Sequence, residues 1–130
     1  MRAVAVEEEI EVQRDMDLIR SVLLFVEQDP QLDGIHPAAL ESTDFPGHSQ
    51  AQVDYHVKIL IKGGFLEGST MMNAPPVVLS LTWNGHEFIG SISDQGIWEK
   101  VKGRIAGLPD VALSVVWELG KSELKKKLGL

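Results

Sequence analysis

The chain has 130 residues, 12 lysines and arginines against 19 acidic residues, a formal net charge of −7, and no cysteine. This length predicts one domain whose core needs neither disulfides nor a structural metal. The lack of cysteine excludes a disulfide framework, a thiolate nucleophile and a cysteine-ligated zinc. No apolar run approaches the ~18 residues that cross a bilayer, and the first residues lack a signal-peptide pattern. We therefore expect a cytoplasmic protein.

Charge is distributed unevenly along the chain. Residues 1–13 carry four glutamates against Arg2, and their glutamate run predicts an acidic, flexible N-terminal arm. Residues 14–95 hold four basic and eleven acidic residues, a net charge of −7, whereas residues 96–130 carry a net charge of +3. We expect the middle of the protein to repel a polyanion and the C-terminal part to attract one.

The first predicted helix follows Asp15, which suits a helix N-terminus, and it ends at Asp29-Pro30. Apolar residues recur in it at helical spacing, from Leu18 to Val26. The next twenty residues are rich in turn formers, with one helical turn expected around residues 37–41.

A second amphipathic helix runs from a cap at Ser49 to the glycine pair Gly63-Gly64. At ~100° per residue its inner face holds Val53, Val57, Leu60 and Ile61. The opposite face holds Ala51, Gln52, Tyr55, Lys58, Ile59 and Lys62. The stretches "FLEGS" and "PPVVLSLTW" then predict two strands of a β-hairpin.

Three further helices are predicted after the hairpin. The first is capped by Thr82 and turns Phe88, Ile89 and Ile92 inward. The second buries one face through Trp98, and a breaker at residues 107–109 separates it from the third. The third packs through Val111, Val115 and Leu119 or Trp117, and the three tryptophans Trp83, Trp98 and Trp117 are expected to anchor the core.

The order helix, short helix, helix, hairpin predicts an α+β fold, a winged helix-turn-helix with a two-stranded wing. We expect a winged-helix domain over residues 14–95 and a C-terminal helical extension over residues 96–130 packed on it.

Five blocks resemble the DUF2513 family, small proteins of unknown function common in bacteria, phages and prophages. These are "RDMDLIRSVLLFVE", "QVDYHVKILIKGGFLEG", "LTWNGHEFIGSISD", "WEKVKGRI" and the closing "KKKLGL". The likeness spans about residues 14–130 and implies a fold and a genomic setting. It implies no activity, since the family has no catalytic or binding residues to carry over.

The outer face of the second helix is the first candidate site. Gln52 and Tyr55 suit base edges, and Lys58 and Lys62 suit phosphates. Ile59 favours a protein partner or a dimer seam instead. Two lysines are few beside the about six to ten phosphate contacts of well-studied DNA-binding proteins.

Other candidates are the hairpin tip and the C-terminal lysines. The tip contains Met71 and Met72 but no arginine or lysine, so it either makes an adaptable protein contact or folds onto the body. A phosphate backbone, an acidic partner or simply the helix dipole can explain the basic cluster of Lys121, Lys125, Lys126 and Lys127. The four histidines match no metal motif, which favours hydrogen-bonded structural roles.

We expect a non-catalytic protein without a cofactor, because nucleophile-elbow and nucleotide-loop motifs are lacking. The sequence favours a DNA-binding accessory regulator of phage or mobile-element type, acting on double-stranded DNA as a homodimer. The alternative is an acidic protein-interaction module, a phage-type inhibitor or DNA mimic that binds a host protein and no DNA.

Overall fold

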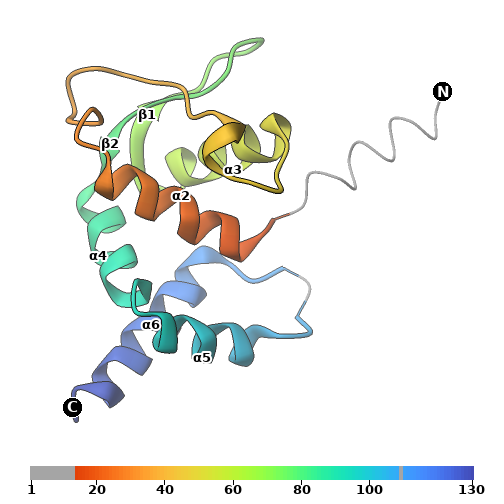
Figure 1. The fold of residues 1–130 in the computed structure, drawn as a ribbon. Helices are drawn as coiled ribbons and strands as arrows, with labels where there is room; N and C mark the ends of the chain where they lie inside the picture. The colour runs from red at the N-terminus through yellow and green to blue at the C-terminus, as the bar shows by residue number, and fades with distance from the viewer. Residues whose placement is uncertain (1–13, 109) are drawn as a thin grey trace, which may run out of the picture.

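The computed structural model describes residues 14–108 and 110–130. This part of the chain is α+β, with five α-helices and one two-stranded antiparallel sheet (Figure 1). The elements are α2 (Met16–Gln28), η1 (Ser42–Asp44), α3 (Gln50–Lys62), β1 (Leu66–Ser69), β2 (Val77–Leu81), α4 (Trp83–Ile92), α5 (Gln95–Ile105) and α6 (Leu113–Lys127). Their order is compatible with a winged helix that carries a C-terminal helical extension. The arm predicted over residues 1–13 lies outside the described residues.

Helices α2, α3 and α4 begin at the residues that the sequence predicts. Asp15, Ser49 and Thr82 each accept a hydrogen bond from a backbone N–H three residues on, at 3.1, 3.2 and 3.0 Å. Such caps satisfy amide groups that have no partner within the helix. The predicted starts of α2, α3 and α4 are therefore confirmed.

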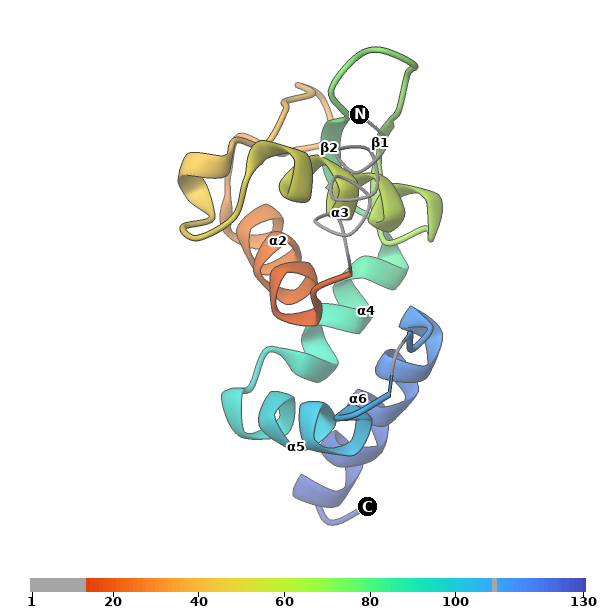
Figure 2. The same cartoon turned by 90° about the vertical axis from the view of Figure 1, so that its right-hand side faces the viewer.

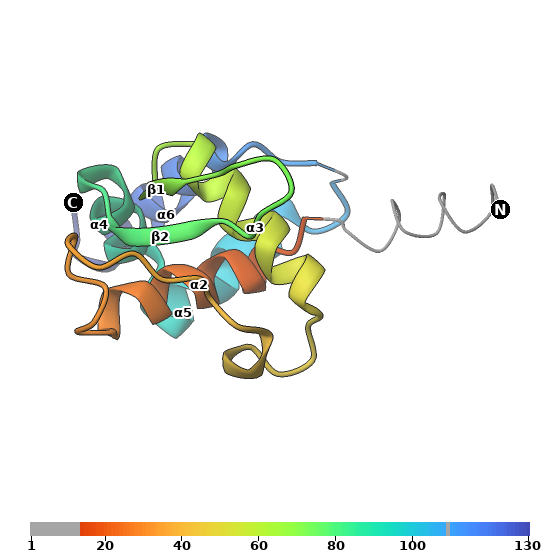
Figure 3. The same ribbon diagram turned by 90° about the horizontal axis from the view of Figure 1, so that it is seen from above.

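Helix α2 lies at the centre of the molecule. It contacts α3, β2 and α4, and α6 packs on both α4 and α5. In Figure 1 the hairpin and α3 lie on one side of α2, and α5 lies on the other. The view from above shows the hairpin beside α3 (Figure 3). Helix α6 thus packs on α4, which belongs to residues 14–95, here called the winged-helix-like portion. No helix of the described residues is long and apolar enough to span a bilayer.

The segment between α2 and α3 differs from the prediction. Residues 37–41 form no helical turn; Ala38 pairs instead with Val78, through N–H to carbonyl bonds of 3.0 and 2.8 Å. The helical turn comes later, at Ser42–Asp44. An extended conformation at Ala38 satisfies backbone groups at the edge of β2, which a local helical turn would leave unpaired.

Two predictions of core residues were wrong. Trp98 is buried and Trp117 partly buried, but Trp83 is 76 % exposed. Trp83 lies about 180° around α4 from the buried Ile92 at ~100° per residue, so it cannot share that inner face. On α6, Val115 is 46 % exposed, and the buried stripe runs through Val116, Gly120 and Glu123.

Gly120 explains where the inner face of α6 lies. A Cβ atom at this position would lie 2.7 Å from Cγ2 of Ile92 and 2.8 Å from Oγ of Ser91. The missing side chain lets α6 approach α4 closely. The helical spacing of large apolar residues does not reveal this buried face of α6, because the residue at its centre is a glycine.

Gly85 sets the distance between α4 and the corner that follows α3. A Cβ atom there would lie 2.0 Å from the backbone oxygen of Phe65. We expect Gly85→Ala to lower the free energy of unfolding by about 2 kcal/mol or more, because backbone must move. Gly90 lies on the same helix with open space around it, so Gly90→Ala should raise stability by roughly 0.5–1 kcal/mol. Urea unfolding measures both, and equal effects would contradict the assigned packing.

Candidate nucleic-acid interface

A capping box fixes the start of α3. The Ser49 hydroxyl accepts from the Gln52 N–H at 3.2 Å, and Oε1 of Gln52 accepts from the Ser49 N–H at 2.8 Å. The two bonds give a partner to the backbone N–H groups of both residues, and they define the direction in which the helix leaves the loop. Because Oε1 of Gln52 is engaged here, only its Nε2 group is available to donate to a ligand.

The inner face of α3 is buried as predicted. Val53, Val57 and Leu60 are at most 1 % exposed, and the helix packs against α2 and β1. Helix α5 and the C-terminal half of α6 lie on the other side of α2 from α3 (Figures 1 and 2). The C-terminal helices therefore do not seal the outer face of α3.

The predicted outer-face residues differ in exposure. Lys62 is exposed, whereas Gln52, Tyr55, Lys58 and Ile59 are half-buried. Ile59 packs against the edge of the core, so it offers less apolar surface than an outward isoleucine would. Neither lysine forms an ion pair with residues 14–108 or 110–130.

The other two basic residues of the winged-helix-like portion serve internal contacts. Arg14 donates from Nη1 to the carbonyl of Val111 at 2.8 Å. Arg20 donates to the carbonyls of Ile92 and Ser93 at 2.9 and 2.7 Å. Lys58 and Lys62 are consequently the basic side chains of this portion that the described residues leave open to a ligand.

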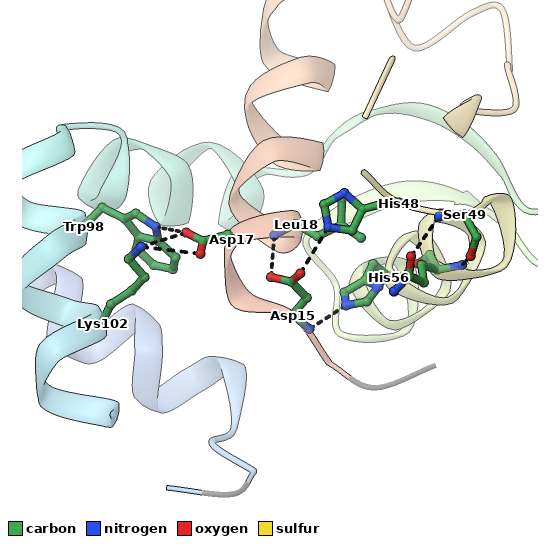
Figure 4. A network of polar contacts seen from close by, with 9 residues as sticks. Asp15, Asp17, Leu18, His48, Ser49, His56, Trp98 and Lys102 are labelled. Carbon is green, nitrogen blue, oxygen red and sulfur yellow. Dashed lines mark hydrogen bonds and ion pairs between the residues drawn. The ribbon is translucent and has the colours of Figure 1, made fainter. Parts of the chain in front are cut away.

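Behind this face a buried histidine joins α3 to the start of α2 (Figure 4). Nε2 of His56 accepts from the Asp15 N–H at 2.7 Å, so the proton lies on Nδ1, which donates to the carbonyl of Gln52 at 2.7 Å. His48 lies 3.1 Å from the Asp15 carboxylate. The structural role predicted for the histidines is thus observed at His56.

Burial lowers the pKa of His56 below its ordinary value, because a charged imidazole loses hydration in the core. The bond to Gln52 and the charge of Asp15 oppose this shift, whereas the charges of His48 and Arg14 add to it. Protonation would also place a second N–H opposite the amide of Asp15. His56 therefore fits its site only in the neutral form.

Asp17 joins α2 to the C-terminal extension (Figure 4). Its carboxylate accepts from Nε1 of Trp98 at 2.7 Å and lies 3.1 Å from Nζ of Lys102. Burial alone would raise the pKa of Asp17, but the bonds from Trp98 and Lys102 and the nearby positive charges lower it overall. The extension is therefore fixed to α2 by polar as well as apolar contacts.

The hairpin places two methionines at an exposed tip. The strands pair from Leu66 with Leu81 to Ser69 with Val77, with a bulge after Glu67. Met71 is 68 % exposed and Met72 is 89 % exposed. The alternative in which these methionines fold onto the body is therefore wrong.

The C-terminal lysines are mostly paired within the protein. Lys121 pairs with Glu118 at 2.6 Å, Lys126 with Glu123 at 3.5 Å, and Lys127 with Asp94 at 2.6 Å. Of this cluster, only Lys125 has no ion pair with a described residue. The C-terminal half of α6 also lies far from α3 in both side views (Figures 1 and 2). The two predicted basic sites thus do not form one surface.

Comparison with known proteins identifies the family. The profile of the family described as "Hypothetical protein (DUF2513)" matches residues 13–107. The chain belongs to the DUF2513 family. The DUF2513 match covers α2 to α5 and stops before α6, so it does not include the closing "KKKLGL" block. An "Uncharacterized protein" of Haemophilus influenzae is 28% identical over 121 residues, 90% of this chain and 99% of that protein. No solved structure matches the DUF2513 chain.

Sequence reasoning missed the two polar contacts that orient the helices of this DUF2513 protein. Asp15 and His56 are 41 positions apart, and Asp17 and Trp98 are 81 positions apart. No local spacing marks either pair. The available signal was a histidine on the border of an apolar helical face, where a buried ring requires a partner at both nitrogens.

His56 should make stability depend on pH. The unfolded histidine, with a pKa near 6.5, binds a proton more readily than the folded one, so stability falls as pH drops from about 7.5 to about 5.5. In His56→Gln this loss should be smaller, although the variant is less stable at neutral pH. His36→Gln changes an exposed histidine and should keep the full loss. An unchanged pH slope in His56→Gln, measured by urea unfolding, would contradict the neutral buried ring.

Proposed function

We propose that this DUF2513 protein is a non-catalytic, cytoplasmic DNA-binding accessory regulator of phage or mobile-element type. Its helix α3 would enter the major groove of double-stranded DNA, with the β1–β2 hairpin alongside. The observation that carries this proposal is the outer face of α3, which presents Tyr55, Lys58 and Lys62 and is not sealed by the C-terminal helices. A major groove admits one α-helix of this kind.

The side chains of α3 divide into two roles. Lys58 and Lys62 are one helical turn apart on the same side, which suits contacts to successive phosphates. Tyr55 and the Nε2 group of Gln52 lie nearer the start of the helix and suit base edges. Ser69, Thr70 and Asn73 of the hairpin are small polar residues that can add hydrogen bonds to the backbone of DNA.

The low number of available cations implies weak, mildly salt-dependent binding. With two phosphate contacts per chain, the slope of log K against log salt is about −1.8. Affinity then falls about twelvefold between ~50 and ~200 mM salt. The acidic body around α3 adds repulsion, which confines the approach of DNA to the α3 face.

Binding of a labelled duplex, measured by anisotropy over a salt series, tests this proposal. The wild-type chain should show the slope of about −1.8 per protomer, and the double change Lys58→Gln and Lys62→Gln should remove most of it. The matched control is Lys100→Gln with Lys125→Gln, exposed lysines of the C-terminal extension, which should leave the slope unchanged. Absence of binding at low salt, or a slope insensitive to the α3 lysines, would refute it.

A second candidate function has support on a different surface. The carboxylates of Asp29, Glu41 and Asp44 border a hollow with the apolar side chains of Phe25 and Leu40, and no residue of α3 lines it. The portion of the chain that contains it has a net charge of −7. These features suit the alternative function predicted from the sequence, an acidic module that inserts into a basic groove of a host protein.

A pull-down of one host protein from a lysate would distinguish the two candidate functions. If the acidic hollow is the contact, Asp29→Asn, Glu41→Gln and Asp44→Asn together should abolish capture, because the partner loses its charge complement. The Lys58→Gln, Lys62→Gln chain should retain capture. Capture that depends on the α3 lysines instead would exclude the hollow as the contact.

A further inference from the structure

The β1–β2 hairpin ends in an uncharged tip that carries two exposed methionines. The tip, residues 70–76, lies between the two strands. Met71 and Met72 are both largely exposed to solvent, and residues 68–86 contain no aspartate, glutamate, lysine or arginine. Such a tip cannot form ion pairs with phosphates. What it offers to a partner is two adaptable apolar side chains.

The backbone of the tip is held in a defined turn. The Ala74 N–H donates to the carbonyl of Met71 at 3.3 Å, which places Met72 and Asn73 at the two central positions of the turn. Asn73 has a φ of 63°, in the left-handed region that asparagine tolerates better than most residues. Two prolines follow directly after Ala74, and each fixes its own φ. Little backbone entropy is therefore lost when the methionines insert into a partner.

The tip projects past the outer face of α3. Strand β1 contacts α3, and in both side views the tip extends beyond α3 on the side away from α2 (Figures 1 and 2). Lys58 and Lys62 lie more than half a turn around α3 from the buried His56, which bonds to the start of α2. The two lysines and the tip are therefore directed to the same side. A duplex that lies against these lysines would meet the methionines as well.

We propose that Met71 and Met72 insert as a wedge between two stacked base pairs, in the minor groove next to the major groove that α3 enters; this inference rests on the proposed function. Methionine is among the apolar side chains that minor-groove proteins insert between base steps, and such insertion kinks the duplex toward the major groove. Burial of the two side chains offsets the cost of unstacking. Pyrimidine–purine steps unstack most readily, so the wedge selects a site with such a step at a fixed distance from the α3 contacts.

The surroundings of the methionines favour a duplex as their partner. Ser69, Thr70 and Asn73 flank them, and these side chains can donate to sugar and phosphate oxygens at the rim of a groove. The nearby outer face of α3 supplies the cations that hold the duplex in place. A pocket of another protein is the other partner that suits methionines, and the experiment below distinguishes the two.

Fluorescence of a labelled duplex tests the wedge with the full-length chain. The duplex carries one TA step whose adenine is replaced by 2-aminopurine, which brightens on unstacking, and a dye at each end that reports bending by energy transfer. Binding should brighten the 2-aminopurine and bend the duplex by about 20–90°. Met71→Asn with Met72→Asn should abolish both signals and lower affinity by about tenfold or more, the value of one buried methionine. The matched control, Met71→Leu with Met72→Leu, should keep both signals, because leucine is also a wedge residue.

The outcomes separate failure of the inference from failure of the proposed function. If binding keeps a salt slope that depends on Lys58 and Lys62 but the duplex stays straight and stacked, the function stands and the inference falls. Equal bending by the asparagine and leucine chains would overturn the inference too. If unstacking persists in the Lys58→Gln, Lys62→Gln chain with an unchanged salt slope, the wedge stands and the proposed role of α3 falls. If no form binds a duplex, both fall, and capture of a host protein that requires both methionines would assign the tip to a protein pocket.

Discussion

The bonds of one neutral histidine determine which face of α3 the protein presents. His56 is buried, with Nε2 accepting from the start of α2 and Nδ1 donating within α3. This arrangement fixes the rotation of α3 about its own axis. At ~100° per residue, Lys58 and Lys62 lie about 200° and 240° around the helix from His56, so they point away from α2. The two lysines lie on the outer face of α3 because the ring of His56 lies on the inner face.

Formal charge misrepresents what this surface offers to a ligand. The extension over residues 96–130 has a net charge of +3, yet several of its cations hold the protein together. Lys102 binds Asp17 of α2, Arg104 binds the buried Glu123, and Lys127 binds Asp94 at the start of α5. Charges already paired at short range contribute little to attraction of a distant polyanion. The basic tail is thus mainly an internal connection.

Short-range features of the fold could be predicted from the sequence, and long-range features could not. Caps at Asp15, Ser49 and Thr82, and the buried face of α3, depend on residues within one or two helical turns. The pairing of Ala38 with Val78 depends on positions far apart in sequence, and it replaced a local helical turn that turn formers had favoured. On the candidate site, the residue types of α3 were predictable. Their exposure and the internal pairing of the C-terminal lysines depend on tertiary contacts that no spacing encodes.

The two candidate functions require different surfaces, so the acidity of residues 14–95 is compatible with both of them. A DNA duplex would meet α3, where Lys58 and Lys62 are open, and the surrounding carboxylates would disfavour every other approach. A basic protein groove would instead meet the hollow bordered by Asp29, Glu41 and Asp44, for which the lysines of α3 are irrelevant.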